Sequence, residues 1–358
     1  MPAVARYRIA VIAGDGIGPE VMVEGQRVLD AVGTRHGIEW DWQSLPWGCR
    51  YYQETGAMMP EDALGQLAGH DAIYLGAVGY PGVPDHVSLW GLLIPIRRHF
   101  DQYVNLRPVR LFAGVRSPLR DRTPEEIDFV VVRENVEGEY SQIGGKLYAG
   151  TEQEMVVQET VFTRRGVDRI LRFAFELAQR RRRQLTSATK SNGIIHTMPF
   201  WDERFATIGM DYPDVQQQQF HIDILTAHFV THPDWFDVVV GSNLFGDILS
   251  DLGPALAGSI GLAASANINP QGDQPSMFEP VHGSAPDIAG KGIANPVGQI
   301  CSGAMMLEHL GHQEAADQLL AAVASVLAEL RQHTPDLGGS STTSALGDAV
   351  VQAVSGPA

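Results

Sequence analysis

Apolar residues along the chain follow two spacings. Short runs of mostly apolar residues predict buried strands, whereas longer segments with an apolar residue at every third or fourth position predict amphipathic helices. The predicted strands are 9–13, 72–76, 129–133, 184–189 and 238–241, and the predicted helices include 19–36, 167–179, 297–310 and an Ala/Leu-rich tail at 304–331. This alternation of strands and helices is typical of an α/β fold with parallel strand pairing.

The chain is long enough to form more than one hydrophobic core. It has 358 residues, of which 44% are hydrophobic, and this length exceeds one typical domain and predicts two lobes. No linker rich in Pro, Gly or Ser divides the sequence. We therefore expect the boundary between the lobes to lie within continuous structure.

Charge and composition narrow the classes of function. A formal net charge of −16 argues against binding of nucleic acid, which requires a basic surface. No apolar run approaches the length of a membrane helix, and residues 1–8 lack the features of a secretory signal peptide. Cys49 and Cys301 provide no disulfide framework and are expected to be buried structural thiols. We therefore expect a cytoplasmic protein that binds neither membranes nor nucleic acid.

Two carboxylates form the most informative pattern in the chain. Asp247 and Asp251 are four residues apart, so both project from one face if their segment is a helix. The segment follows the apolar run 236–240 and the polar turn 241–243, and α/β folds build ligand sites at such places. Hard divalent cations prefer oxygen ligands of this kind. The pair therefore predicts a Mg²⁺ or Mn²⁺ site, with a solvated helix face as the alternative.

Three arginines lie beside apolar neighbours. Arg97, Arg107 and Arg133 occupy segments in which a guanidinium without an anionic partner would be costly. Planar guanidinium groups bind carboxylates through paired hydrogen bonds, so three of them suit a dicarboxylate. A local cluster is also needed because the net charge of the chain repels an anionic substrate. The alternative is internal ion pairing with Asp101 or Glu134.

Three further polar residues are candidates for proton transfer or metal binding. Tyr140 lies in the segment 137–145, and Lys190 follows the predicted strand 184–189. A lysine near cations has a lowered pKa and can act as a base, and a tyrosine can then act as the acid. Taken singly, a residue of either type is more often a surface residue than a catalyst. Asp223 lies within an apolar segment, where a carboxylate needs a partner.

Two glycine-rich loops differ in what they can bind. The loop 14–19 lacks the third glycine of the dinucleotide-binding fingerprint, because Pro19 stands at that position. A standard Rossmann half is thus disfavoured. The loop 282–296 permits close approach of a bulky ligand, and Asp287 within it can accept hydrogen bonds from a ribose diol. The alternative is an ordinary loop in which Asp287 only caps a turn.

Together these segments resemble the β-decarboxylating dehydrogenase family, which includes the isocitrate and isopropylmalate dehydrogenases. The resemblance spans nearly the whole chain and rests on the blocks 14–20, 105–108, 243–251 and 282–290. It implies a two-lobed α/β fold like that of isopropylmalate dehydrogenase, not a standard Rossmann fold.

The resemblance also implies how the lobes and the candidate residues are used. A cofactor-binding lobe would comprise residues 1–103 plus 260–358, and a metal, substrate and dimerisation lobe would comprise 104–259. By this resemblance, the substrate carboxylates would be bound by Arg97, Arg107 and Arg133, and Tyr140 would protonate the carbon that loses CO₂. The metal would be bound by Asp247 and Asp251 together with Asp223 of the partner subunit, and proton transfer at the substrate hydroxyl would involve Lys190 of the partner subunit. NAD would be bound by His282, Gly283, Ser284, Ala285, Pro286, Asp287, Ile288 and Asn295.

Within the family, the segment 85–97 resembles the enzymes that act on tartrate and D-malate. The isopropylmalate dehydrogenases lack Trp90 and have one residue fewer before the position of Arg97. The resemblance therefore implies NAD- and divalent-metal-dependent oxidation, with decarboxylation, of small 2-hydroxy dicarboxylic acids by a homodimer with shared active sites. It leaves open whether a monovalent cation such as K⁺ assists. The alternatives are a 3-isopropylmalate dehydrogenase and a metal- and anion-binding protein without turnover.

Overall fold

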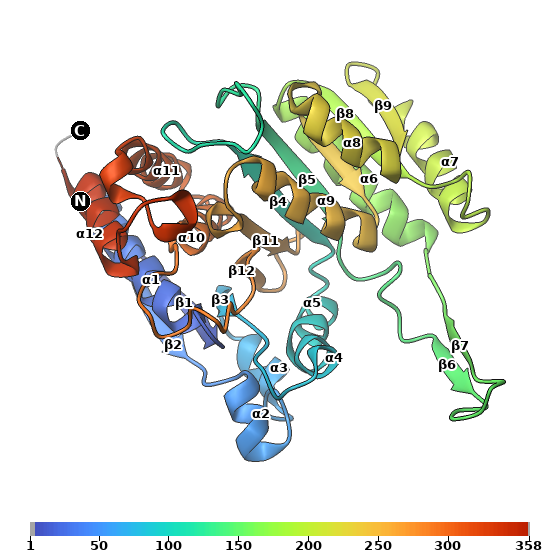
Figure 1. Ribbon diagram of the computed structural model, residues 1–358, viewed down its shortest axis with the longest axis horizontal. Coiled ribbons are helices and arrows are strands. Elements are labelled where there is room, and N and C mark those ends of the chain that lie inside the picture. The colour runs from blue at the N-terminus through green and yellow to red at the C-terminus, as the bar shows by residue number, and fades with distance from the viewer. Residues whose placement is uncertain (1–3, 357–358) are drawn as a thin grey trace.

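A ten-stranded mixed sheet forms the centre of the protein (Figure 1). The computed structural model describes residues 4–356. The strands of this sheet stand in the order β2-β1-β3-β12-β11-β4-β5-β10-β8-β9. In chain order they are β1 (Ala5–Gly14), β2 (Ile38–Ser44), β3 (Ala72–Ala77), β4 (Val104–Arg110), β5 (Asp128–Glu134), β8 (Gln184–Thr189), β9 (Gln216–His221), β10 (Val238–Gly241), β11 (Ala264–Ile268) and β12 (Ser276–Pro280).

Parallel pairs form both ends of the sheet, and antiparallel pairs form its centre. The pairs from β2 to β12 and from β5 to β9 are parallel, whereas β12-β11, β11-β4 and β4-β5 are antiparallel. The prediction of parallel pairing is therefore confirmed at the two ends and wrong at the centre. For β11 and β12 the reason is their connection, residues 269–275, which is too short for the crossover that parallel neighbours require.

Eight of the α-helices described in residues 4–356 form two groups, one beside each end of the sheet. In Figure 1, α1 and α10–α12 lie together next to β1–β3, and α6–α9 lie next to β8–β10. The helices are α1 (Gly18–His36), α2 (Cys49–Thr55), α3 (Ala63–Leu67), α4 (Asp85–Ser88), α5 (Ile94–His99), α6 (Arg164–Arg180), α7 (Thr197–Gly209), α8 (Ile222–Thr231), α9 (Asn243–Leu256), α10 (Val297–His309), α11 (Gln313–Leu327) and α12 (Thr343–Ser355).

The helix ends follow local sequence signals. Pro19 lies in the first turn of α1, where its missing N–H costs nothing, and Gly37 ends the helix in the left-handed conformation with φ 68°. The Thr163 hydroxyl accepts a hydrogen bond of 3.0 Å from the backbone N–H of Gly166 and caps α6. Such signals explain why the observed bounds of these helices lie close to the predicted ones.

A two-stranded hairpin stands away from the rest of the chain. The strands β6 (Gly144–Leu147) and β7 (Met155–Gln158) pair only with each other, and all eight of their residues are exposed. Figure 1 shows the hairpin extending from the body below α7. The apolar spacing of this segment did not predict it.

The remaining features agree with the composition. Cys49 and Cys301 are unpaired and buried, and burial raises the pKa of each thiol to about 12. The prediction of two buried structural thiols is therefore confirmed. Across residues 4–356, none of the helices combines the length and apolar character needed to cross a membrane.

Candidate active site

The predicted carboxylate pair lies on the helix that follows a buried strand. After β10, the hydroxyl of Ser242 accepts a hydrogen bond from the backbone N–H of Phe245 and caps α9. Asp247 and Asp251 therefore lie one turn apart on this helix. The predicted order of strand, polar turn and acidic helix is confirmed.

Asp247 connects most of the predicted substrate-binding residues. Its Oδ1 atom forms an ion pair with Arg133 and lies 3.4 Å from a guanidinium nitrogen of Arg107. Its Oδ2 atom accepts a hydrogen bond of 2.6 Å from the hydroxyl of Tyr140. Asp251 lies 3.7 Å from Arg107. We refer to Arg97, Arg107, Arg133, Tyr140, Asp247 and Asp251 as the Asp247 cluster.

Arg97 faces the same cluster from helix α5. Its guanidinium donates a hydrogen bond of 2.7 Å to Glu279 on β12. Its positive charge contributes to lowering the pKa of Arg107 and the pKa of Asp247. Asn267 on β11 donates a second hydrogen bond of 2.7 Å to the same Glu279 oxygen.

The expected alternative partners of the arginines were Asp101 and Glu134, and the structure contradicts that pairing. Asp101 forms its ion pair of 2.7 Å with Arg169. Glu134 accepts hydrogen bonds from the backbone N–H groups of Val136 and Glu137 instead. The carboxylates that compensate the arginines come from β12 and α9, and Glu279 was missed. Its signal is present in the sequence, because an acid inside the apolar run 277–280 needs a partner as much as Asp223 does.

The electrostatics of the cluster follow from burial and charge compensation. Burial lowers the pKa of Arg133 to about 10, against the opposing effect of Asp247. Burial alone would raise the pKa of Asp247, but Arg133 and Arg107 outweigh it and hold that pKa below its ordinary value. Burial and the hydrogen bond to Asp247 raise the pKa of Tyr140 to about 12, so the phenol is protonated at neutral pH.

The cluster keeps hydrogen-bonding capacity that the chain itself does not use. The Nε atoms of Arg97 and Arg107 are buried and have no hydrogen-bond partner within residues 4–356. A buried donor left without a partner is costly, and a bound carboxylate would satisfy it. Asp251 offers oxygen atoms as well, since its side chain is 61% exposed and contacts only Arg107 at ion-pair distance.

Lys190 and Asp223 form a separate pair. The Lys190 ammonium, directly after β8, donates a hydrogen bond of 2.9 Å to Asp223 in the first turn of α8. This hydrogen bond lowers the pKa of Asp223. Within residues 4–356, no three metal-binding side chains of the His, Cys, Asp or Glu type form a cluster. A single chain therefore does not bring Asp223 together with Asp247 and Asp251.

The second glycine-rich loop packs against the first. The backbone N–H of Ile17 donates a hydrogen bond of 2.8 Å to the carbonyl of Ser284, and a Cβ atom on Gly16 would collide with that carbonyl. Ile17 also packs with Ala285 and Ile288 in a small apolar cluster. The loop 14–19 thus supports the loop 282–296 rather than forming a dinucleotide site of its own.

Within the second loop, the predicted residues differ in exposure. His282 is buried, and its Nε2 atom has no hydrogen-bond partner in the described part of the chain. Burial lowers the pKa of His282, so its imidazole is neutral near neutral pH. Gly283, Pro286 and Asp287 are exposed, whereas Asn295 is buried and donates a hydrogen bond of 3.0 Å to Asp336.

Comparison with known proteins identifies the family. The family model described as isocitrate/isopropylmalate dehydrogenase matches residues 8–350. The chain belongs to this family. It is 58% identical to D-malate dehydrogenase [decarboxylating] of Escherichia coli (strain K12), over 97% of this chain and 98% of that protein. It is 56% identical to tartrate dehydrogenase/decarboxylase of Pseudomonas putida, over 98% of each chain.

The fold comparison agrees with the family. The crystal structure of isocitrate dehydrogenase from Methylococcus capsulatus has a TM-score of 0.88 and 36% identity, covering 98% of this chain and all of that one. The predictions of an enzyme of this family and of its two-lobed, non-Rossmann α/β fold are confirmed. Members of the family use NAD and a divalent metal. The predicted lobe limits, at 103–104 and 259–260, stay predictions.

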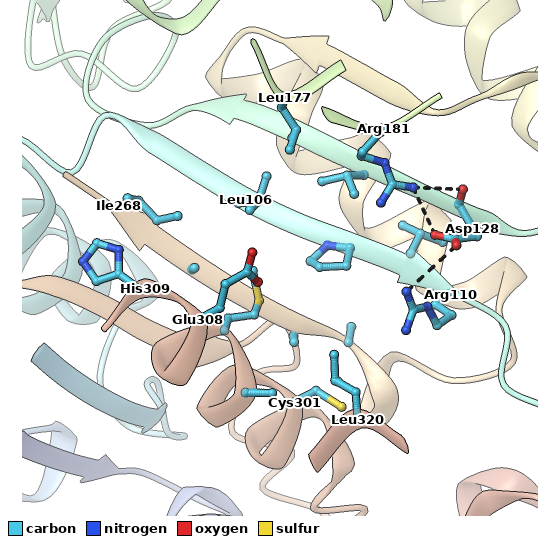
Figure 2. Close-up of a pocket in the computed structure, with 18 of the residues that line it drawn as sticks. Leu106, Arg110, Asp128, Leu177, Arg181, Ile268, Cys301, Glu308, His309 and Leu320 are labelled. Atoms are coloured by element: carbon cyan, nitrogen blue, oxygen red, sulfur yellow. Dashed lines mark hydrogen bonds and ion pairs between the residues drawn. The ribbon is translucent and has the colours of Figure 1, made fainter. Parts of the chain in front are cut away.

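A groove lies outside the candidate active site. Its volume is about 960 Å³. Figure 2 shows that side chains of β4, β11, α6 and α10 line it, among them Leu106, Ile268 and Leu177. At one side of the groove Arg181 forms an ion pair of 3.1 Å with Asp128. None of the predicted site residues lines this groove, so it is separate from the Asp247 cluster.

Proposed function

We propose that this protein is an NAD-dependent and Mg²⁺- or Mn²⁺-dependent dehydrogenase that oxidises and decarboxylates D-malate and tartrate. The observation that carries the proposal is the Asp247 cluster, which combines three buried guanidinium groups, unused N–H donors, two carboxylates and a protonated phenol. The names of the relatives at 58% and 56% identity supply the substrate class.

The donor set suits a dicarboxylic hydroxy acid. Arg97 and Arg107 offer buried N–H groups without partners, and guanidinium groups bind carboxylates with defined geometry. The substrate would therefore be held by its two carboxylates, with its hydroxyl-bearing carbon toward the metal ligands. This arrangement orients the substrate before any chemical step.

Asp247 and Asp251 would hold the divalent cation. Both present oxygen atoms on one face of α9. Within residues 4–356 the Asp251 carboxylate accepts no hydrogen bond and lies 3.7 Å from Arg107. When bound, the cation polarises the oxygen of the carbon that is oxidised. Two carboxylates do not complete the coordination of such an ion, and we infer that Asp223 of the partner subunit supplies a third.

The loop 282–296 would bind NAD. The buried Nε2 of His282 has no partner in the described chain, and Gly283 leaves the surface open beside it. Asp287 is exposed and can accept hydrogen bonds from the ribose hydroxyls.

The proposed reaction consists of an oxidation at C2 followed by a decarboxylation. In the first, the C2 hydrogen of the substrate would leave as hydride, and NAD⁺ held by the loop 282–296 would accept it. The hydroxyl proton would pass to a base, for which we propose the neutral amine form of Lys190 of the partner subunit. In the second, the bond from C3 to the departing carboxylate breaks, its electron pair forms an enolate, and CO₂ leaves. Tyr140 then donates its proton to C3. Its phenol is protonated at neutral pH, because burial and the hydrogen bond to Asp247 raise its pKa to about 12.

Two observations support the proposal of a homodimer with shared sites. The pair of Lys190 and Asp223 lies apart from the Asp247 cluster in one chain. The exposed hairpin β6–β7 carries Ile143 beside it and Leu147 and Val156 within it, and these side chains are 57%, 54% and 65% exposed. An isolated two-stranded hairpin is marginally stable in water, so a second copy of the chain is the partner we propose for it.

Turnover of a substrate panel tests the proposed function. With Mn²⁺ and NAD⁺, we expect NADH and CO₂ from D-malate, and NADH from tartrate. We expect far less NADH from 3-isopropylmalate, since one methylene of misfit is worth roughly 1–3 kcal/mol and an isopropyl group adds several carbons. A comparable kcat/KM for 3-isopropylmalate would instead favour the alternative dehydrogenase, and binding of the acids without NADH formation would favour a protein without turnover.

A further inference from the structure

The backbone that carries Tyr140 is anchored on one side to helix α9. The Glu139 carboxylate accepts hydrogen bonds of 2.7 Å from the Ser242 hydroxyl and 3.0 Å from the backbone N–H of Leu244. The side chain of Asn243 donates a hydrogen bond of 2.9 Å to the carbonyl of Glu137. These contacts join the segment before Tyr140 to the N-terminus of the helix that bears Asp247 and Asp251.

A single guanidinium holds the same segment from the other side. Arg98 on α5 donates a hydrogen bond of 2.7 Å to the backbone carbonyl of Tyr140 itself. The Arg98 guanidinium also lies over the ring of Trp90, with its central carbon 5.0 Å from the ring centroid. Such a stack of guanidinium on indole is favourable when both are partly desolvated.

Arg98 is not explained by charge compensation. Within residues 4–356 no carboxylate lies at ion-pair distance from its guanidinium, in contrast to Arg97, Arg107 and Arg133. Burial lowers the pKa of Arg98, and the charge of Glu134 only partly offsets this effect. A half-buried guanidinium that donates to a carbonyl and stacks on a ring is suited to hold that carbonyl in place.

We propose that Arg98 is a positioning residue for Tyr140 and that Trp90 fixes the Arg98 guanidinium. The proposal rests on the proposed role of Tyr140 as the proton donor to C3. Since Arg98 directly follows Arg97, one short helix holds a substrate carboxylate with one residue and the backbone of the acid with the next. A displacement of the phenol by about 1 Å would slow proton transfer up to about 100-fold.

The test separates proton transfer at C3 from hydride transfer. The holoenzyme with Mn²⁺ and NADH is incubated with pyruvate in D₂O, and exchange of the methyl hydrogens is followed by NMR, because this exchange needs the acid at C3 but no hydride transfer. Hydride transfer is measured separately as the first-turnover burst of NADH from D-malate. The variants are R98M and R98K, with W90L and W90F for the stacked ring and Y140F as the reference for loss of the acid.

We expect R98M to lower the exchange rate about ten- to 100-fold while the hydride burst and the KM for D-malate change about twofold or less. R98K keeps a donor for the Tyr140 carbonyl and should recover part of the exchange, and W90L should impair exchange more than W90F. The matched control is R50M, since Arg50 is 91% exposed and pairs only with Glu54, and this variant should behave as wild type. Thermal unfolding of each variant checks that it folds.

Each outcome decides between distinct conclusions. If R98M lowers exchange and burst equally, or raises only the KM, Arg98 acts in substrate binding and the positioning role is overturned. If exchange is unchanged in R98M but lost in Y140F, only the role of Arg98 fails. If Y140F keeps full exchange, the proposed acid is wrong, and the positioning role fails with it.

Discussion

In the Asp247 cluster, carboxylates and guanidinium groups of a single chain form buried ion pairs. Lys190 and Asp223 form a separate ion pair in which the Asp223 carboxylate is exposed to solvent. The Arg133 side chain is 2% exposed, and it pairs with a carboxylate that also accepts from Tyr140. The side chain of Asp223 is 66% exposed. A buried cluster of this kind is set by folding before any ligand arrives, while an exposed pair contributes little until something covers it.

The difference bears on how the active site is assembled. Folding of one chain orders the groups that would hold the substrate and two metal ligands. The groups that we assign to the neighbouring site remain free to exchange one partner for another. Removal of a buried group should therefore affect stability in the first region, and removal of Lys190 or Asp223 should affect assembly of the active site.

The largest effect is expected from loss of the metal ligands. D247N and D251N should each lower kcat/KM at least about 1,000-fold, or about 4 kcal/mol, because polarisation of the reacting oxygen is lost. Only D247N should also lower the unfolding temperature strongly, since it leaves the buried Arg133 uncompensated at a cost of about 3–5 kcal/mol. Activity assays and thermal unfolding of both variants measure this.

Chelation provides the matching test without a substitution. Wild-type activity should vanish in excess EDTA and return on addition of Mn²⁺ or Mg²⁺. Full activity in EDTA would remove Asp247 and Asp251 from metal binding, and equal thermal destabilisation by D247N and D251N would contradict the contrast between a buried and an exposed carboxylate.

Subunit mixing tests the exposed pair. K190A and D247N should each be inactive as homodimers. In a heterodimer, one site receives both lesions and the other receives neither, so random exchange of subunits should restore about a quarter of wild-type activity. The measurement is NADH formation after co-refolding. No recovery despite demonstrated subunit exchange would mean that Lys190 serves its own chain.

The sequence predicted those parts of the fold and site that local patterns determine. The strand 184–189 and the strand 238–241 were predicted with their observed limits, because apolar runs between turn residues are local signals. Asp247 and Asp251 were recognisable because helical spacing alone puts them on one face.

Contacts between distant segments could not be predicted in the same way. Arg97 on α5 and Glu279 on β12 form a hydrogen bond although they are 182 positions apart in the chain, and no local pattern links the two segments. The hairpin β6–β7 was missed because both of its faces are exposed, so no alternation of buried and exposed positions marks it. The hydrogen bond from Arg98 to Tyr140 goes to a backbone carbonyl, which leaves no trace in the choice of residue at position 140.

A smaller effect, on the pH dependence of stability, is expected from Glu134, which is buried on β5 next to Arg133. Burial raises the pKa of Glu134 to about 7, above its ordinary value of 4.5. A raised pKa means that the folded state favours the protonated form, so the contribution of Glu134 to stability is highest below about pH 4.5 and is lost as the pH rises to 7, by roughly 2–3 kcal/mol. E134Q should therefore lose less stability than wild type between pH 5 and 8.

Thermal unfolding across this pH range measures the difference, and E54Q, at an exposed glutamate, is the control that should keep the wild-type slope. If the unfolding temperatures of E134Q and wild type change equally with pH, Glu134 is ionised throughout this range. The charge of Glu134 is then compensated more completely than we infer.

The smallest effect concerns Asp287, which resembles Asp223 in being an exposed carboxylate that would be completed only by a ligand. An ionised carboxylate there accepts hydrogen bonds from the 2′- and 3′-hydroxyls of NAD but repels a 2′-phosphate, and the nearest following cation in sequence is Lys291. The ratio of kcat/KM values should favour NAD over NADP by at least about tenfold, or about 1.4 kcal/mol. D287K should narrow this ratio without changing the unfolding temperature, because the side chain is exposed. A wild-type preference for NADP would remove Asp287 from the cofactor site, and a strong loss of stability in D287K would place it with the buried, pre-paired groups instead.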